Sequence, residues 1–338
     1  MILGFVDMIN VAKILVVDCA SVKHGEKVLV VTDASRLSIA IVLAAAARER
    51  DAESVIMVMP PPKVPGQEPS IIVAEAMKNA HVIFLPLTRS IAHTTATIEA
   101  RKAGARVISM AEFTEEMMVS GGMEADFVSQ KPLVEKLAEL LTNANTAQVE
   151  SPLGTNISMQ LAERKGRALT GIAHEPGSYA TPPDIEASIA PLEDTAEGVV
   201  MVDGSIAGIG LLTETVKLVV KKGKVVEILG GTEARKLKDM LEEAKNPNVY
   251  RIAELGIGLN PKAKLKGTIL EDEGALGVIH IAVGKNYTFG GKIDAPIHVD
   301  SMLLNCTLKL DGKLVLKDGK LLNLQVGRHS EGRFHEKK

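Results

Sequence analysis

KVLVVTDASRLSIAIVLAAAARERDAESVIMVMP, residues 27–60, places two short β-branched runs on either side of a longer stretch with helical periodicity. This pattern predicts two parallel strands joined by a right-handed crossover helix. The alternation continues in HVIFLPL and RVISM, at residues 81–87 and 106–110. The first part of the chain is therefore predicted to form an α/β domain, doubly wound around a mostly parallel sheet.

The second part of the chain shows a different pattern, with alternating apolar runs separated by tight-turn dipeptides. Asp-Gly occurs at 203–204, 311–312 and 318–319, and Lys-Gly at 222–223, which indicates hairpins. One helical stretch, TEARKLKDMLEEAKN, interrupts them. We expect an α+β domain with a largely antiparallel sheet. The predicted domains are an N-terminal α/β domain at 1–148, a C-terminal α+β domain at 149–330, which also contains the candidate metal-binding and catalytic residues described below, and a polar tail at 331–338.

Composition limits the classes of partner. The 338 residues are 46% hydrophobic, the formal net charge is −3 and the pI is about 6.3, so nothing favours nucleic acid or an anionic membrane surface. The two cysteines lie far apart and suggest no disulfide framework. The first twenty residues are typical of an amphipathic helix and not of a signal peptide. We expect a cytoplasmic protein that acts on a small molecule.

A histidine and an aspartate lie two positions apart in the apolar run IHVD. Side chains at i and i+2 of a strand share a face, so His298 and Asp300 are predicted to project together. Taken alone, such a pair is also compatible with a partly exposed edge couple. The metal hypothesis needs further ligands.

Further candidate ligands occur in the same half of the chain. His280 lies in an apolar strand-like run with Tyr287 seven residues later, Glu254 is followed by two glycines, and Glu186 lies in a short extended run after two prolines. Carboxylates are rarely buried unless they are paired or bound to a cation. Two imidazoles and three carboxylates suit borderline divalent ions, so a site for two ions of Zn, Co or Mn is predicted.

Several motifs in a fixed order resemble a known family. The thermophilic metallo-aminopeptidases of the aminopeptidase T and aminopeptidase S type, also called leucyl aminopeptidases, are similar in the stretches SPLGTNISMQLAERKGR, PPDIEASIAPLEDTAEG, IAELGIGLNP, HIAVGKNY and IHVD. The resemblance implies a homodimer that releases N-terminal residues from peptides through a water activated by two divalent ions. The implied metal ligands are Glu186, Glu254, His280, Tyr287, His298 and Asp300. Glu254, Glu273 and Tyr287 are the candidates for a catalytic role.

The same superfamily contains 2,5-dihydroxypyridine dioxygenase, a mononuclear iron(II) enzyme that opens a ring. The position resembling Glu254 is a histidine there, whereas the pair at 298 and 300 is shared, so Glu254 favours the peptidase branch. In the dioxygenase alternative, His280, His298 and Asp300 are the candidate iron ligands. A second alternative is a non-enzymatic α/β protein with a ligand at the strand ends of the first domain.

Three other polar positions are given structural interpretations. Arg164 and Arg167, in LAERKGR, could bind a substrate carboxylate, but they more often mark a solvated helix end. His93 follows a strand and is interpreted as part of a solvated loop that starts a helix.

Overall fold

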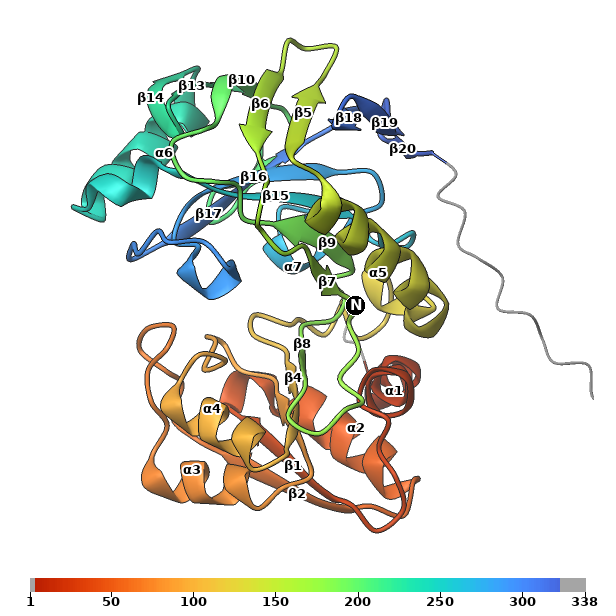
Figure 1. Ribbon diagram of the computed structural model, residues 1–338. Coiled ribbons are helices and arrows are strands. Elements are labelled where there is room, and N and C mark those ends of the chain that lie inside the picture. Colours follow the sequence, from red (N-terminus) through yellow and green to blue (C-terminus); the bar gives the residue numbers. More distant parts are fainter. Residues whose placement is uncertain (1–3, 323–338) are drawn as a thin grey trace, which may run out of the picture.

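The computed structural model describes residues 4–322 and contains three β-sheets. In Figure 1 a parallel α/β layer lies below two antiparallel sheets, and the seven-stranded antiparallel sheet lies between the other two. The prediction of an α/β region followed by a largely antiparallel region is confirmed. The predicted tail at 331–338 lies outside the described residues.

The five-stranded sheet is parallel throughout, in the order β2-β1-β3-β4-β8. Its strands are β1 (Lys27–Thr32), β2 (Glu53–Val58), β3 (Val82–Leu85), β4 (Arg106–Ser109) and β8 (Tyr179–Ala180). Its helices and helical turns are α1 (Phe5–Lys13), the π-helix η1 (Ile14–Cys19), the 3-10 turn η2 (Ala34–Arg36), α2 (Leu37–Arg48), α3 (Ile71–Lys78) and α4 (Thr95–Lys102). Strand β8 reaches this sheet from well beyond residue 148, so the chain returns to the first layer after entering the second.

The eight-stranded sheet has the order β14-β13-β10-β6-β5-β18-β19-β20. Its strands are β5 (Thr146–Glu150), β6 (Asn156–Gln160), β10 (Glu197–Val202), β13 (Val216–Lys221), β14 (Lys224–Leu229), β18 (Thr307–Leu310), β19 (Lys313–Lys317) and β20 (Lys320–Leu321). The Lys222-Gly223 and Asp311-Gly312 turns have positive φ at both residues, which is the backbone that two-residue hairpins require. The predicted hairpins at these dipeptides are therefore present.

The seven-stranded sheet has the order β12-β11-β17-β16-β15-β9-β7. Its strands are β7 (Arg167–Leu169), β9 (Glu186–Ile189), β11 (Ser205–Ile206), β12 (Gly210–Leu211), β15 (Ile252–Gly258), β16 (Ile279–Gly284) and β17 (His298–Leu303). The remaining helical elements are η3 (Gly122–Glu124), α5 (Phe127–Asn143), α6 (Thr232–Glu243), η4 (Pro247–Tyr250), α7 (Ile269–Asp272) and η5 (Tyr287–Phe289). Helix α5 contacts β7 and β9 at one end of this sheet.

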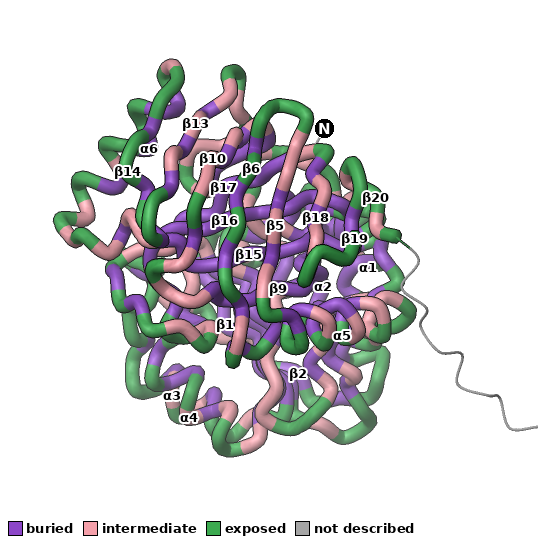
Figure 2. Tube along the Cα trace, turned by 45° about the horizontal axis from the view of Figure 1, so that its top comes forward, coloured by how far each residue is buried: buried purple, intermediate pink, exposed green. Residues whose placement is uncertain are grey.

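The two faces of the seven-stranded sheet differ in character. Leu255, Ile281 and Val299 point to one side and belong to the main hydrophobic core, which also contains residues of the eight-stranded sheet. The intervening residues point to the other side, toward the parallel layer. Because the central strands are buried throughout (Figure 2), polar residues on this second face are removed from bulk water.

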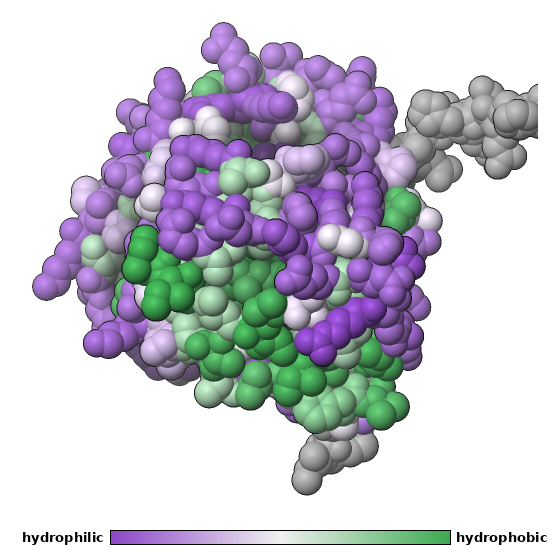
Figure 3. Space-filling model, turned by 90° about the horizontal axis from the view of Figure 1, so that it is seen from below, coloured by the Kyte–Doolittle hydropathy of each residue, from purple (hydrophilic) through white to green (hydrophobic). Residues whose placement is uncertain are grey.

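The outer surface of the parallel layer carries exposed apolar residues. Val55 and Val58 of the edge strand β2 and Ile71 and Ile72 of α3 are each at least half exposed. Apolar side chains also gather on the face of the molecule seen from below in Figure 3. Among residues 4–322, no helix combines the length and apolar character needed to cross a membrane.

Candidate metal centre

Five neighbouring strands contribute side chains to the polar face of the seven-stranded sheet. Residues directly opposite in antiparallel strands point to the same side. Ala282 of β16 lies opposite both Glu254 and Asp300. The same rule places on this face Arg167, Leu169, Glu186, Ser188, Gly256, His280 and His298. Residues as far apart in the sequence as Arg167 and Asp300 therefore meet on one surface.

Small residues make room for the imidazole rings on this face. A Cβ atom added at Gly256 would lie 2.0 Å from Nε2 of His280, so only glycine fits below this ring. Ala282, which separates Glu254 from Asp300, is fully buried and leaves the space between the two carboxylates open. Gly256, the first glycine after Glu254, thus allows the His280 ring to approach the strand closely.

The ligand-type side chains form two clusters that share Glu254. One consists of Glu186, Glu254 and His280, and the other of Glu254, His298 and Asp300; within each cluster one ligand atom per residue lies within 4.8 Å of the others. Five of the six predicted ligands are therefore brought together. The sixth, Tyr287, has a side chain that is 53% exposed and lies over the Lys285 ammonium, so the structure does not bring it to the clusters.

The second cluster is built around an oriented histidine. Nε2 of His298 lies 3.2 Å from both Glu254 Oε2 and Asp300 Oδ1, and Nδ1 lies 2.7 Å from the Lys285 carbonyl oxygen. Because the carbonyl can only accept, Nδ1 must carry the proton and donate it. This contact fixes the ring and directs Nε2 between the carboxylates, as metal-binding histidines are usually held. Phe289 packs edge-on against the same ring, with centroids 4.9 Å apart.

The charges of this second cluster explain its pKa shifts. Burial favours the neutral form of His298, but Asp300 and Glu254 outweigh it and raise the His298 pKa well above its usual value. Burial also opposes ionisation of Glu254, yet His298, His280 and Arg167 lower the Glu254 pKa to about 2. The protonated His298 ring thus supplies a positive charge beside Glu254 and Asp300, as a bound metal ion would.

Three further acidic groups in the site have raised pKa values, in contrast to Glu254. Burial, reinforced by neighbouring carboxylates, raises the pKa values of Asp184, Glu186 and Glu273 well above normal. Asp184 Oδ1 and Glu186 Oε2 are buried with no hydrogen-bond partner among the described residues. Unsatisfied buried carboxylate oxygens of this kind fit a divalent cation, because uncompensated buried charge is costly.

The acidic run at residues 271–273 separates into structural and site residues. Residues 269–272, which overlap this run, form the short helix α7. Glu271 accepts a hydrogen bond from the Gly122 backbone, and Asp272 accepts from the backbone of Lys266 and Gly267. Glu273 alone lines the cavity beside the clusters.

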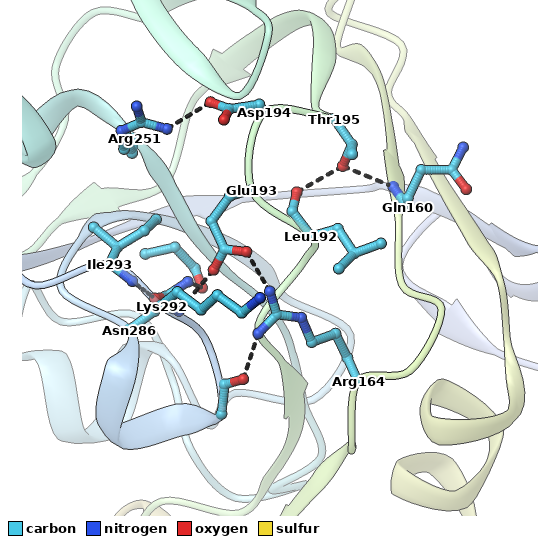
Figure 4. A network of polar contacts seen from close by, with 12 residues as sticks. Gln160, Arg164, Leu192, Glu193, Asp194, Thr195, Arg251, Asn286, Lys292 and Ile293 are labelled. Carbon is cyan, nitrogen blue, oxygen red and sulfur yellow. Dashed lines mark hydrogen bonds and ion pairs between the residues drawn. The ribbon is translucent and has the colours of Figure 1, made fainter.

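The two arginines of LAERKGR lie in extended and turn structure and not at a helix end. Arg164 is buried and pairs with Glu193 and the Gly290 carbonyl, while Glu193 also accepts from the Lys292 backbone at 2.7 Å (Figure 4). Arg167 begins β7 and reaches the site, where its guanidinium lies 4.4 Å from the Phe289 ring centre. The prediction of a solvated helix end was wrong for both.

A cavity of about 220 Å³ opens over the clusters. Its walls include residues that the sequence did not single out as site residues, Asp184, Tyr179 and Phe289, together with His93 from the parallel layer. Asp184 could have been found from its place two residues before Glu186 in PPDIEAS. His93 was considered but interpreted as a solvated loop residue, because no sequence pattern shows that the loop after β3 faces the other layer.

The fold and the clusters together define a small polar cavity, enclosed by an antiparallel sheet and an α/β layer and lined by side chains that could hold a metal ion. The family model described as NicX, 2,5-dihydroxypyridine 5,6-dioxygenase, matches residues 14–323, and the chain belongs to this family. A curated 2,5-dihydroxypyridine 5,6-dioxygenase from Pseudomonas putida KT2440 is 28% identical over 255 residues, which cover 71% of each chain.

Solved structures show the same fold. The structure of 2,5-dihydroxypyridine dioxygenase from Pseudomonas putida KT2440 superposes with a TM-score of 0.81 at 23% identity and covers 96% of this chain and 100% of that one. Wild-type AmpT from Thermus thermophilus gives a TM-score of 0.68 at 17% identity over 94% and 99% of the two chains. These similarities show a shared fold, and the family match is to the dioxygenase.

The family match corrects the functional prediction. The expected aminopeptidase, and with it the assignment as a hydrolase, protease or metallo-exopeptidase, was wrong, because the family and the curated relative are dioxygenases. The error has a physical origin: the aminopeptidase and the dioxygenase share the fold, and the prediction rested on the identity of the single residue Glu254. A site for two ions of Zn, Co or Mn is likewise unsupported.

Proposed function

We propose that this protein is an iron(II)-dependent dioxygenase that cleaves the ring of a dihydroxylated pyridine, with Glu254, His298 and Asp300 as the iron ligands. The observation that carries the proposal is the convergence of these three side chains in a member of the dioxygenase family, with the His298 ring oriented by the Lys285 carbonyl. The predicted homodimer remains a prediction.

The donor set fits iron(II) with one departure from the usual pattern. Non-haem iron oxygenases commonly use two histidines and one carboxylate with open positions. Here Glu254 supplies a second carboxylate, and His280 forms its cluster with Glu186 and Glu254, not with His298 and Asp300. Imidazole nitrogen and carboxylate oxygen remain suitable ligands for this ion. The alternative trio of His280, His298 and Asp300 is not gathered into one cluster.

Bound iron(II) would supply the redox chemistry through which dioxygen reacts with an aromatic ring. The chain's own residues prepare the site for the ring. Phe289, Leu169 and Leu270 give the cavity apolar walls, and its 220 Å³ is below the roughly 300–1,000 Å³ of pockets for drug-sized ligands, which favours a single ring. Burial raises the pKa values of Glu273 and Asp184, which favours the protonated forms that can donate to oxygen atoms of a ligand.

The test is oxygen uptake by the reconstituted protein. Protein loaded anaerobically with iron(II) and then mixed with 2,5-dihydroxypyridine in air-saturated buffer should consume oxygen as the ultraviolet absorbance of the ring disappears. His24→Ala and Asp294→Asn, at exposed positions that belong to neither the clusters nor the cavity lining, serve as controls for His298→Ala and Asp300→Asn. Ring persistence without oxygen uptake in the iron-loaded protein would contradict the proposal.

A further inference from the structure

Arg167 and Arg164 are three residues apart but use their guanidinium groups differently. Arg164 is 7% exposed and makes hydrogen bonds to Glu193 and Gly290. The Arg167 side chain is 33% exposed, and no hydrogen bond links it to any residue in the range 4–322. A guanidinium has five N–H donors, so those of Arg167 are available to a ligand.

Two contacts hold the Arg167 side chain in place without occupying these donors. The guanidinium carbon lies 4.4 Å from the centre of the Phe289 ring, and Nη1 lies 3.5 Å from Glu254 Oε1, which is an ion-pair distance and longer than a good hydrogen bond. Phe289 is itself positioned by the loop that Arg164 and Glu193 fix in Figure 4. Arg167 is thus preorganised.

The position of Arg167 relates it to both the metal clusters and the free space. It lines the 220 Å³ cavity over the clusters and also a second cavity of about 160 Å³ that shares Leu169, Tyr179 and Thr181 with the first. Through the strand register it lies on the same face of the sheet as Glu186. A ligand ring in the first cavity would therefore have Arg167 on its wall.

The charged residues that line the cavity are mainly acidic, so an acidic ligand needs Arg167 as a cationic partner. Five carboxyl groups line the first cavity, Asp184, Glu186, Glu254, Glu273 and Asp300, and Arg167 is the only arginine or lysine that lines it among the described residues. A ring bearing a hydroxylate would be repelled by the ionised carboxylates among these five groups. Arg167 is placed to offset this repulsion.

We propose that Arg167 binds an ionised hydroxyl of the substrate ring and thereby selects hydroxylated rings in their anionic form. This inference rests on the proposed function, because the substrate class comes from it. Arg167 acts here as a specificity-determining residue, with Phe289 as the surface on which its guanidinium lies.

The experiment measures binding without turnover, so it does not depend on oxygen chemistry. Zinc-loaded protein under anaerobic conditions is titrated with 2,5-dihydroxypyridine, 2-hydroxypyridine and 3-hydroxypyridine, and dissociation constants are compared in wild type, Arg167→Met and Arg167→Lys. In wild type, removal of the hydroxyl that faces Arg167 should weaken binding about tenfold to a hundredfold, the range for charge-assisted hydrogen bonds. The hydroxyl ratio is the dissociation constant of the ring without this hydroxyl divided by that of the ring with it. In Arg167→Met the hydroxyl ratio should fall to near one, and in Arg167→Lys it should be intermediate.

A matched control and a pH series complete the test. Arg251→Met removes an arginine whose side chain is also 33% exposed and pairs with a carboxylate, Asp194, outside the cavity, so it should keep the wild-type ratio. Wild-type affinity should rise as the ligand hydroxyl ionises, and this rise should be lost in Arg167→Met. Thermal unfolding identifies any variant that fails to fold, in which case Arg167→Lys alone decides.

The outcomes separate this inference from the proposed function. Equal hydroxyl ratios in wild type and Arg167→Met, or no binding of any of the three rings to wild type, would overturn the role of Arg167. Ring cleavage with equal ratios would contradict only the inference. If the hydroxyl ratio depends on Arg167 but the iron-loaded protein consumes no oxygen, the inference is supported and the proposed dioxygenase activity is contradicted.

Discussion

The two ligand clusters share Glu254 but hold their histidines in different ways. His280 is 1% exposed, its Nε2 lies 3.2 Å from Glu186 Oε2, and its Nδ1 has no hydrogen-bond partner within the described chain. His298 is anchored through Nδ1 to a backbone carbonyl and directs Nε2 at two carboxylates. Ligand count alone would suggest two metal sites, whereas the Lys285 carbonyl behind His298 orients only that histidine toward a ligand position.

The largest expected difference between the clusters concerns their ligands. His298→Ala and Asp300→Asn should each weaken iron binding by more than about 100-fold, because loss of a ligand costs at least as much as loss of a group that supports one. His280→Ala should leave iron affinity within about tenfold of wild type. Equilibrium dialysis with iron(II) measures both. Equal losses in His280→Ala and His298→Ala would remove the distinction between the clusters.

The next effect tests how the His298 cluster is supported from outside. Arg164→Met leaves Glu193 without its cation, and breaking a largely buried ion pair costs about 3–5 kcal/mol. Because this pair fixes the loop that carries Lys285 and Phe289, we expect a lower free energy of unfolding together with weaker iron binding. Denaturant titration and dialysis provide the two readouts. Arg251→Met, which breaks an exposed pair, is the control and should change stability by less than about 1 kcal/mol.

The His280 cluster can be disturbed separately through the glycine beneath it. Gly256→Ala would place a Cβ 2.0 Å from His280 Nε2, and overpacking of this kind costs about 1–3 kcal/mol. Iron binding at the other cluster should persist. The double variant Gly256→Ala/His280→Ala removes the ring that clashes and should recover the stability lost in the single variant. If the double variant gains nothing over Gly256→Ala, the close approach is not the cause.

The metal-free protein should also show a pH dependence of its free energy of unfolding. His298, Asp184, Glu186 and Glu273 have pKa values raised by folding, so the folded state holds more protons than the unfolded state. Stability must then fall as pH rises above the unfolded carboxyl pKa of about 4.3, by about 1.4 kcal/mol per pH unit for each extra proton held. Glu254 has the opposite effect, but only between about 2 and its unfolded value.

Thermal unfolding of the metal-free protein between pH 5 and pH 8 measures this dependence. A bound divalent ion should flatten it, because the ion replaces the protons as the partner of the carboxylates. A rise in stability over the same interval would show that these groups are ionised in the fold without a metal.

The sequence was a better guide to the sheet than to its surroundings. Strand alternation placed His298 and Asp300 on one face, and burial arguments selected Glu186, Glu254 and His280, because their positions depend on regular strands. Tyr287 was placed with them by resemblance, but it lies on a 3-10 turn that exposes it. Turns and loops have no periodicity from which a direction could be deduced.

The residues that complete the cavity come from elements that only the tertiary structure positions. Arg167 lies on an edge strand of three residues, Phe289 on a loop fixed by Arg164, and His93 on a loop of the other layer. The choice between peptidase and dioxygenase failed for a related reason. That choice depended on the residue type of Glu254. Because both clusters share Glu254, its residue type does not determine how many ions the site holds.

The most direct test of the account is the number of iron ions bound per chain under anaerobic conditions, measured together with oxygen consumed per 2,5-dihydroxypyridine. We predict one iron per chain, lost in Asp300→Asn and retained in His280→Ala, and one dioxygen consumed for each ring opened. Two ions per chain, with no oxygen uptake, would contradict both the assignment to the His298 cluster and the dioxygenase activity.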